Sequence, residues 1–453
     1  MNDYEKYFND IIKIDPSLSF NIGNKTPYTL SHYTNYISDD YLKKLFRIYR
    51  KYRNTSDIQL KQDINYIKHY FKYKIYLYNL IDTFDNNIIL FEYATKHIYP
   101  PSKLYEIYRR NDFNIYIKNL IYRLKQSLKL KITVPYIICK NYMEQIRKLD
   151  NFKIYKELYA YLEDHYLNNC RKTIGICHLP NGRNIYKILI LNNLGFYKSP
   201  EEIHKLGLKL IKKPLTRNNK SYKSRDELFK DCLAISLYIY ENIIDKYFYY
   251  KPAEPFKIKK VPENLEYTSS LAYYNHIEKA VFINLRYYKE CNLISLYSLL
   301  MHECFHQYHF MFMEYYKLPK YKIFGYNNLT LIEGFAHYME IYCENYDDDN
   351  NEYSLLRKIR LVVDTGINYY GWTYKKAFEY MYKYFPNRTE DIINEINRYI
   401  NIPAQALCYT VGKHEIIKMR DNFIKNKKGN IKDFHHKLLI NGTVSITFLK
   451  SIL

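Results

Sequence analysis

Two histidines four residues apart flank a glutamate in the stretch HECFH, residues 302–306. On an α-helix, residues four apart lie on one face, so the imidazoles of His302 and His306 can bind the same metal ion. Glu303 then lies beside the ion, where it can act on a water molecule as a general base. The motif can arise by chance in a chain with 14 histidines, so its meaning depends on the residues that follow it.

A third ligand can come from the stretch LTLIEGFAHYME, residues 329–340, in which apolar residues recur at helical spacing. A catalytic zinc ion uses three protein side chains and keeps a fourth position open, and Glu333 can supply the third. His337, one turn further on, is an alternative ligand. Glu340 lies on the same face as Glu333 and can hold a ligand histidine from behind.

The elements that must position these residues are mostly helices. Apolar residues recur at i, i+3 and i+4 over three long stretches, which predicts helices over Asp63–Leu80, Leu104–Leu130 and Asp226–Tyr247. Pro319 and Gly325 predict a loop between the two metal-binding segments. The fold class that follows is mainly α.

One short segment has strand character. The run AVFINL, Ala280–Leu285, is rich in β-forming residues and lies just before the HECFH helix. An edge strand beside a metal can pair its free N–H and C=O groups with an extended peptide. A strand inside the core fits this run equally well. We expect a small β-sheet or an edge strand beside the site.

The composition is that of a globular protein, with 47% hydrophobic and 26% charged residues among 453. The net charge of +22 suggests nucleic-acid binding. In Lys43–Arg53 and Lys118–Lys131, however, the basic residues alternate with apolar ones at helical spacing, which favours solvated helix faces. We expect no specific nucleic-acid partner and only weak, salt-sensitive binding to polyanions.

The eight cysteines are scattered without a C-x-x-C pair, which predicts neither a disulfide framework nor a zinc ribbon. The amino terminus is polar, unlike a signal peptide. No run of residues approaches the ~20 apolar residues that a membrane span needs. These features predict a cytoplasmic protein without a membrane partner.

Six blocks between Gly175 and Arg420 resemble, in the same order, the bacterial proteins grouped as domain of unknown function 885, a zincin-like metallopeptidase family. The blocks are GICHLPNGRNIY, SPEEIHKLGLKLI, YFYYKPAEPFKIKKVPE, SSLAYYNHIEKAVFINL, EGFAHYME and PAQALCYTVGKHEIIKMR. The last block is similar to a proline-glycine-glutamine motif followed by S-Y-x-x-G. The resemblance implies a zincin-like catalytic domain over residues 166–453. It leaves residues 1–165 as a helical region that forms a wall or lid of the substrate channel.

The resemblance also implies an activity, the zinc-dependent hydrolysis of peptide bonds with one Zn²⁺ per chain. His302, His306 and Glu333 would be the ligands and Glu303 the general base. Tyr409, which falls on the tyrosine of S-Y-x-x-G, would stabilise the oxyanion, although a packing role fits it equally well. Analogy with other helical zincins favours short peptides as substrates.

The chain departs from the family at the metal motif, where the family reads H-E-x-x-P-G-H. If the Pro-Gly pair is deleted here, His306 is the second ligand. Without a gap, Tyr308 takes the histidine position and His309 lies beside it. The i, i+4 spacing favours His306 and leaves His309 at the surface or behind the ligands. A zincin scaffold without turnover, or a basic nucleic-acid-packaging protein, is the alternative function.

The remaining residues of these blocks have structural interpretations. Arg420 can hold a substrate carboxylate, but a structural ion pair is favoured. Gly334 and Gly412 are expected to permit a close approach between helices. Cys304 lies between the ligands on another helix face, which predicts a core position.

Overall fold

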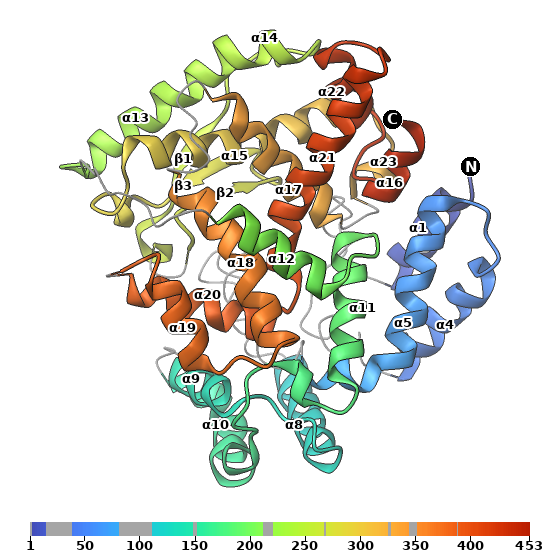
Figure 1. The fold of residues 1–453 in the computed structure, drawn as a ribbon. Coiled ribbons are helices and arrows are strands. Elements are labelled where there is room, and N and C mark those ends of the chain that lie inside the picture. The colour runs from blue at the N-terminus through green and yellow to red at the C-terminus, as the bar shows by residue number, and fades with distance from the viewer. Residues whose placement is uncertain are drawn as a thin grey trace. The chain divides into compact units, whose positions relative to one another are not determined.

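The computed structural model describes residues 2–14, 39–80, 111–147, 152–211, 221–266, 269–324, 328–343, 351–386 and 388–453. Most of the described residues lie in helices, and three short strands form one sheet (Figure 1). This composition confirms the predicted mainly α class. The chain divides into two compact units, each discontinuous in sequence. The predicted division into a helical region, residues 1–165, and a catalytic domain, residues 166–453, stays a prediction.

Unit 1 comprises Met1–Leu189, Val363–Tyr382 and Asn387–Pro403. Its α-helices are α1 (Asp3–Ile14), α4 (Asp39–Tyr52), α5 (Ile58–Leu80), α8 (Asn111–Lys129), α9 (Tyr136–Arg147), α10 (Phe152–Tyr161), α19 (Tyr374–Tyr382) and α20 (Thr389–Asn401). Short π and 3₁₀ helices are η1 (Leu162–Tyr166), η2 (Leu167–Asn169) and η3 (Ile176–His178). Helices α5 and α8 confirm two predicted helices, except that residues 104–110 lie outside the described residues.

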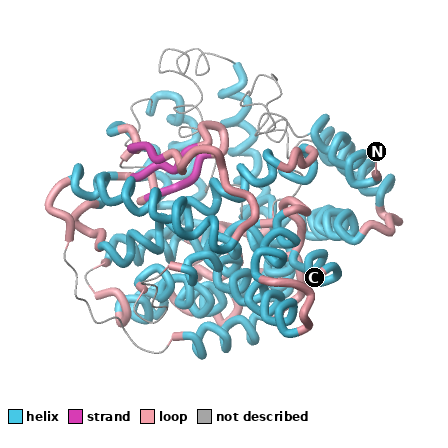
Figure 2. Tube along the Cα trace, turned by 90° about the horizontal axis from the view of Figure 1, so that it is seen from above, coloured by secondary structure: helices cyan, strands magenta, loops and turns pink. Residues whose placement is uncertain are grey.

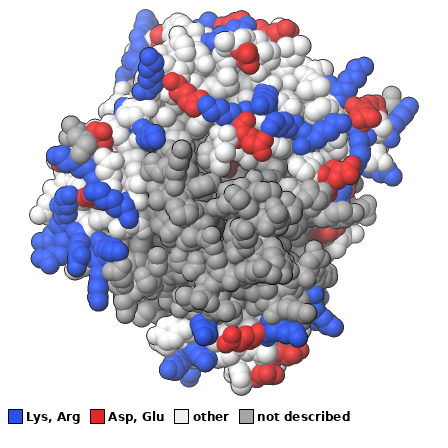
Figure 3. Space-filling model, turned by 180° about the vertical axis from the view of Figure 1, so that it is seen from behind, with Lys and Arg blue, Asp and Glu red and all other residues white. Residues whose placement is uncertain are grey.

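The basic face of α4 is solvated, as its sequence pattern predicts. Leu45 and Ile48 are buried, whereas Lys43, Lys44 and Arg47 are exposed. On the face of the molecule that Figure 3 shows, Lys and Arg side chains lie next to Asp and Glu side chains over part of the surface of the described residues. The expectation that the protein has no specific nucleic-acid partner stays a prediction.

Unit 2 comprises Ile190–Val362, Lys383–Pro386 and Ala404–Leu453. Its α-helices are α12 (Pro200–Leu210), α13 (Arg225–Tyr238), α14 (Ile244–Tyr247), α15 (Leu293–Tyr315), α16 (Lys320–Phe324), α17 (Leu329–Met339), α21 (Cys408–Lys425), α22 (Ile431–Leu439) and α23 (Ile446–Ile452). Short helices are η4 (Ile239–Ile243), η5 (Glu263–Leu265), η6 (Leu285–Tyr287), η7 (Glu340–Tyr342) and η8 (Gln405–Leu407). Helices α11 (Gly182–Leu194) and α18 (Glu352–Asn368) have residues in both units.

Two predictions in unit 2 are confirmed and one needs correction. Helix α13, the π-helical turn η4 and α14 together cover the predicted helix Asp226–Tyr247. Cys304 is fully buried in the large apolar cluster of this unit, as predicted. The predicted loop after Pro319 contains the short helix α16, because Pro319 O accepts a hydrogen bond from Lys322 N and so opens a helical turn. Gly325 lies outside the described residues.

The sheet lies against the helix that carries HECFH (Figure 2). Its strands are β1 (Ile258–Lys260), β2 (Ala272–Asn275) and β3 (Ala280–Ile283), in the order β1-β3-β2. Strand β3 pairs in parallel with β1 and antiparallel with β2. Of the two interpretations of the run Ala280–Leu285, the edge strand is therefore wrong, and the strand inside the core is the one that the structure shows. The physical reason is that all four β3 residues are buried, and a continuous apolar run is typical of a central strand.

Helices α17 and α21 cross at two glycines, which confirms the predicted close approach. A Cβ atom on Gly334 would lie 2.6 Å from Gly412 Cα, and one on Gly412 would lie 2.2 Å from the carbonyl oxygen of Thr330. Only residues without a side chain allow this separation of the backbones. The crossing fixes α17, which carries Glu333, against α21, which carries Tyr409.

We expect Gly412→Ala to destabilise unit 2 by about 3 kcal/mol or more, because the added methyl group overlaps backbone that cannot move alone. The midpoint of thermal unfolding measures this effect. Asn422→Ala, on the exposed side of the same helix, is the matched control and should change stability by less than ~0.5 kcal/mol. An unchanged midpoint for Gly412→Ala would contradict the close crossing.

Ala404, just before the turn η8, has a left-handed backbone with φ of 72°. The proline-glycine-glutamine motif that the block from Pro403 to Arg420 resembles has glycine at the position of Ala404. We expect Ala404→Gly to stabilise the protein by about 0.5–1 kcal/mol, since relief of the left-handed conformation outweighs the extra flexibility of the unfolded chain. Ala406→Gly, in the same turn, is the control and should lower the thermal midpoint instead. A lower thermal midpoint for Ala404→Gly would contradict a strained backbone at this residue.

No helix in the described part of the chain is long and apolar enough to cross a membrane. All eight cysteines are free thiols, and seven of them are buried.

Candidate metal centre

Helix α15 presents the two motif histidines on one face. The Asn292 side chain caps its first turn by accepting a hydrogen bond from Ser295 N. The helix is buried on several sides, and Phe305 and Tyr308 belong to the apolar cluster of unit 2. His302 and His306 lie on the side that faces α17, with ring centroids 4.7 Å apart.

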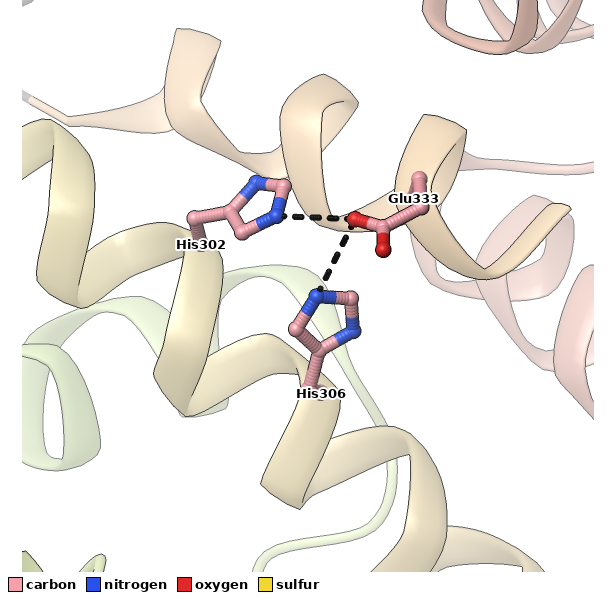
Figure 4. Close-up of side chains that lie close together, drawn as sticks. All are labelled: His302, His306 and Glu333. Carbon is pink, nitrogen blue, oxygen red and sulfur yellow. Dashed lines mark hydrogen bonds and ion pairs between the residues drawn. The ribbon is translucent and has the colours of Figure 1, made fainter. Parts of the chain in front are cut away.

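Glu333 on α17 meets both histidines, as Figure 4 shows. Its Oε2 lies 3.1 Å from Nε2 of His302 and 3.4 Å from Nε2 of His306. The three candidate donor atoms lie within 4.8 Å of one another. The structure thus brings together the three residues that the sequence predicts as ligands.

These distances fit a metal ion. Two imidazole nitrogens and a carboxylate oxygen are a donor set that suits zinc. Donors at about 2.0–2.2 Å from a tetrahedral zinc ion stand roughly 3.3 Å apart, close to the observed separations. The side chains of His306 and Glu333 keep 13% and 17% of their surface exposed, so the group is reachable from solvent.

Glu340 holds His302 from behind, as predicted. Its Oε1 lies 3.0 Å from His302 Nδ1, and its Oε2 accepts a hydrogen bond of 2.6 Å from Ser298. The guanidinium of Arg357 pairs with the same carboxylate at 2.8 Å. With Nδ1 engaged by Glu340, the Nε2 atom of His302 is the one directed at Glu333, and this fixes the ring orientation that a metal ligand needs.

The charges at this centre are strongly coupled. Burial and Arg357 lower the pKa of His302, but hydrogen bonds with Glu333 and Glu340 outweigh them and raise it to about 9. Burial raises the pKa of Glu333, yet its contacts with His302 and His306 hold that pKa well below its ordinary value. Without metal, the carboxylates therefore keep a proton on His302. A zinc ion bound at His302 would displace that proton and would bring two positive charges in place of one.

Glu303 lies next to the group but outside it. Its side chain is buried, with 8% of the residue exposed. Its negative charge helps to raise the pKa of His302, so Glu303 acts electrostatically on this candidate ligand. A carboxylate that acts on a candidate metal ligand suits a general base, and this role of Glu303 stays a prediction.

Tyr409 on α21 packs against the centre. Its ring stacks on the His302 ring at a centroid distance of 6.1 Å and an interplanar angle of 18°. The guanidinium of Arg360 lies 5.0 Å from the Tyr409 ring, and that of Arg357 lies 5.8 Å from it. Tyr409 is thus near the predicted ligands, and both the oxyanion role and the packing role stay predictions.

The structure separates the alternative ligands from the group. The hydroxyl of Tyr308 donates to Tyr250 O at 2.8 Å, away from Glu333. Of the two places predicted for His309, at the surface or behind the ligands, the surface is wrong, because His309 is buried beside Phe335. Burial, and then His306, lower the pKa of His309 to about 3. His337 is buried with Nδ1 3.2 Å from Glu340 Oε1, so it too lies behind the ligands.

Arg420 has a structural role, as favoured from the sequence. It pairs with Asp421 at 2.7 Å and packs over the Tyr338 ring. Ser298 and Arg357, the two further partners of Glu340, are not among the residues predicted from the sequence. Ser298 precedes His302 by one helical turn, which is a usable signal, whereas nothing local marks Arg357 on α18.

Comparisons with known proteins give a family and a fold. Residues 211–453, more than half of the chain, match the family described as bacterial protein of unknown function, DUF885. No curated protein matches the chain. A candidate lipoprotein from Colwellia psychrerythraea has a similar structure, with a TM-score of 0.75 and 18% identity over 99% of this chain and 97% of that one.

A second solved structure, a candidate lipoprotein of unknown function from Shewanella oneidensis, has a TM-score of 0.65 and 13% identity, over 100% of both chains. At such identities, these two similarities concern the fold alone. The family match covers α15, α17 and α21, which carry the candidate ligands and Tyr409. The chain belongs to the DUF885 family of bacterial proteins of unknown function.

Proposed function

We propose that this protein is a zinc metallopeptidase with a zincin-like site, acting on peptide bonds of short peptides. The observation that carries the proposal is the convergence of His302, His306 and Glu333, together with the buried Glu303, whose charge acts on His302. A metal site used only for structure is usually closed by four protein ligands, whereas a hydrolytic site keeps one position open. Three donors with partial exposure favour the hydrolytic interpretation.

The residues have distinct roles in this proposal. His302, His306 and Glu333 would hold a zinc ion, which when bound polarises a carbonyl group and acidifies a water molecule. Glu303 accepts a proton from the attacking water and returns it to the leaving amine. Tyr409 donates a hydrogen bond to the substrate oxygen that gains negative charge. Glu340 and Arg357 keep the His302 ring in place.

The preference for short peptides depends on analogy with other helical zincins. The cytoplasmic location stays a prediction, since both similar structures are those of candidate lipoproteins.

The test of this function is the metal content of the purified chain, measured by elemental mass spectrometry without metal-affinity resin. We expect about one zinc ion per chain, lost in His306→Ala because two donors alone bind zinc weakly. Tyr308→Phe is the matched control, and it should retain the metal because its hydroxyl bonds Tyr250 O instead. A chain that binds no zinc even when zinc is offered refutes the proposal.

A zincin scaffold without turnover remains the alternative, and it is separated from the enzyme by a second measurement. Both bind zinc at the same residues. Only the enzyme cleaves members of a library of short peptides, and only its activity disappears with a chelator and returns with added zinc.

A further inference from the structure

The ring of Tyr409 has neighbours on α18 as well as on α15. Arg357 and Arg360 lie about one turn apart on α18, and their guanidinium carbons are 5.8 Å and 5.0 Å from the centroid of the Tyr409 ring. The same ring stacks on the ring of His302 at 6.1 Å. All four residues belong to unit 2. The position of the Tyr409 side chain therefore depends on a candidate metal ligand and on two arginines.

The backbone of α21 at Tyr409 is fixed independently of this ring. The hydroxyl of Thr410, the next residue, donates to Arg357 O at 2.9 Å and so ties α21 to α18. Two residues after Thr410, Gly412 meets Gly334 of α17 too closely for a side chain. The Tyr409 ring, by contrast, can turn about its side-chain torsions unless its neighbours hold it. The contacts with His302 and with the two guanidinium groups are therefore the ones that orient the ring.

The two arginines differ in their main contact. Arg357 pairs with Glu340 at 2.8 Å, whereas Arg360 lies nearer to the Tyr409 ring. Arg360 is buried, with 8% exposed, so its own side chain is held by its surroundings. The negative face of a tyrosine ring attracts a guanidinium group, and this attraction is stronger where water is scarce. The charge of an arginine is also permanent, so the contact does not depend on pH.

We infer that Arg360 is a positioning residue, which holds the Tyr409 ring against His302 so that the Tyr409 hydroxyl can face the substrate oxygen that gains negative charge. The inference rests on the proposed function, in which Tyr409 stabilises that oxygen. Such a donor is effective because it is in place before the reaction begins. A misplacement of about 1 Å costs up to about 100-fold in rate. Arg360 thus acts on the reaction through Tyr409.

A double-mutant cycle on kcat tests this role. The variants are Arg360→Met, Tyr409→Phe and the chain with both changes, measured on a short peptide that the unmodified protein cleaves. We expect kcat to fall about 10–100-fold in Arg360→Met, with KM and zinc content unchanged, and about 10²–10³-fold in Tyr409→Phe. The double variant should be no slower than Tyr409→Phe, because Arg360 then has no hydroxyl to position. Losses that multiply, or a normal kcat in Arg360→Met, would overturn the inference.

Arg420→Met is the matched control, because the Arg420 guanidinium lies 5.7 Å from the centroid of the Tyr338 ring in the same unit. It makes the same substitution at an arginine–tyrosine contact outside the candidate centre, and kcat per bound zinc should stay unchanged. A loss as large as in Arg360→Met would show that any disturbance of unit 2 slows the reaction. That result would also overturn the inference.

The position of the ring is measured separately, without activity. Since the Tyr409 ring stacks on His302, its ring current shifts the NMR signals of the His302 ring in protein made with isotope-labelled histidine. The spectrum of His302→Ala identifies these signals. In Arg360→Met they should move toward their position in Tyr409→Ala, whereas in Arg420→Met they should stay in place. If Arg360→Met does not fold, Arg360→Gln replaces it in both measurements.

The two measurements separate this inference from the proposed function. Unmoved His302 signals in Arg360→Met would overturn the inference even in a chain that binds zinc and cleaves peptides. Moved signals in a chain that neither binds zinc nor cleaves peptides would instead refute the proposed function and, with it, the catalytic use of this contact.

Discussion

Replacing Glu303 by glutamine is expected to stop peptide hydrolysis and leave the metal in place. Glutamine has the same shape as glutamate, but it cannot accept the proton of an attacking water. Loss of a general base lowers kcat by about 10²–10⁴-fold. The measurement compares kcat on a short peptide that the unmodified protein cleaves, together with zinc content per chain. We expect retained zinc because Glu303 lies outside the donor group.

Glu314→Gln is the matched control for this experiment, because it makes the same change on the same helix. The Glu314 carboxylate pairs with Lys279 at the surface, and its side chain is 39% exposed. This variant should keep full activity. Metal-free Glu303→Gln protein would assign Glu303 to metal binding or folding instead. Normal turnover in Glu303→Gln would show that another group is the base.

Replacing Glu340 by alanine is expected to damage both stability and metal binding. Glu340 is fully buried, and Arg357, with 6% exposure, would keep a buried charge without this partner. Breaking such a pair on one side costs about 3–5 kcal/mol. The His302 ring would also lose the group that orients it, which weakens metal affinity by about 10–100-fold. Urea unfolding of the metal-free protein and zinc titration measure the two effects separately.

The double variant Glu340→Ala with Arg357→Met separates the two causes. Removing the guanidinium removes the buried charge, so part of the lost stability should return. Zinc affinity should stay low, because His302 still lacks its partner at Nδ1. Recovery of zinc affinity in the double variant would contradict an orienting role for Glu340. Unchanged affinity in Glu340→Ala would contradict it as well.

The sequence determined the parts of this site that depend on helix geometry. His302 and His306 share a face because they are four residues apart, and this holds for any straight helix. Glu333 and Glu340 were predicted from their spacing on a second helix, and both meet His302. The glycines at 334 and 412 indicated a close crossing, since a missing side chain matters most where backbones touch.

The sequence was a poorer guide where one pattern fits two environments. The run Ala280–Ile283 is apolar at every position, which fits an edge strand packed on one side less well than the central strand that it forms. The spacing of the metal motif leaves His309 either at the surface or behind the ligands, and the packing of Phe335 against its ring buries it. In both cases, burial depends on neighbours that come from other segments.

Only the tertiary structure decided which helices meet and which side chains share a partner. Arg357 on α18 pairs with Glu340. Tyr409 on α21 stacks on His302, although the two residues are more than a hundred positions apart in the sequence. The physical reason is one of range: helical periodicity follows from backbone bonds between near neighbours, whereas contacts between distant helices depend on how the whole apolar core packs.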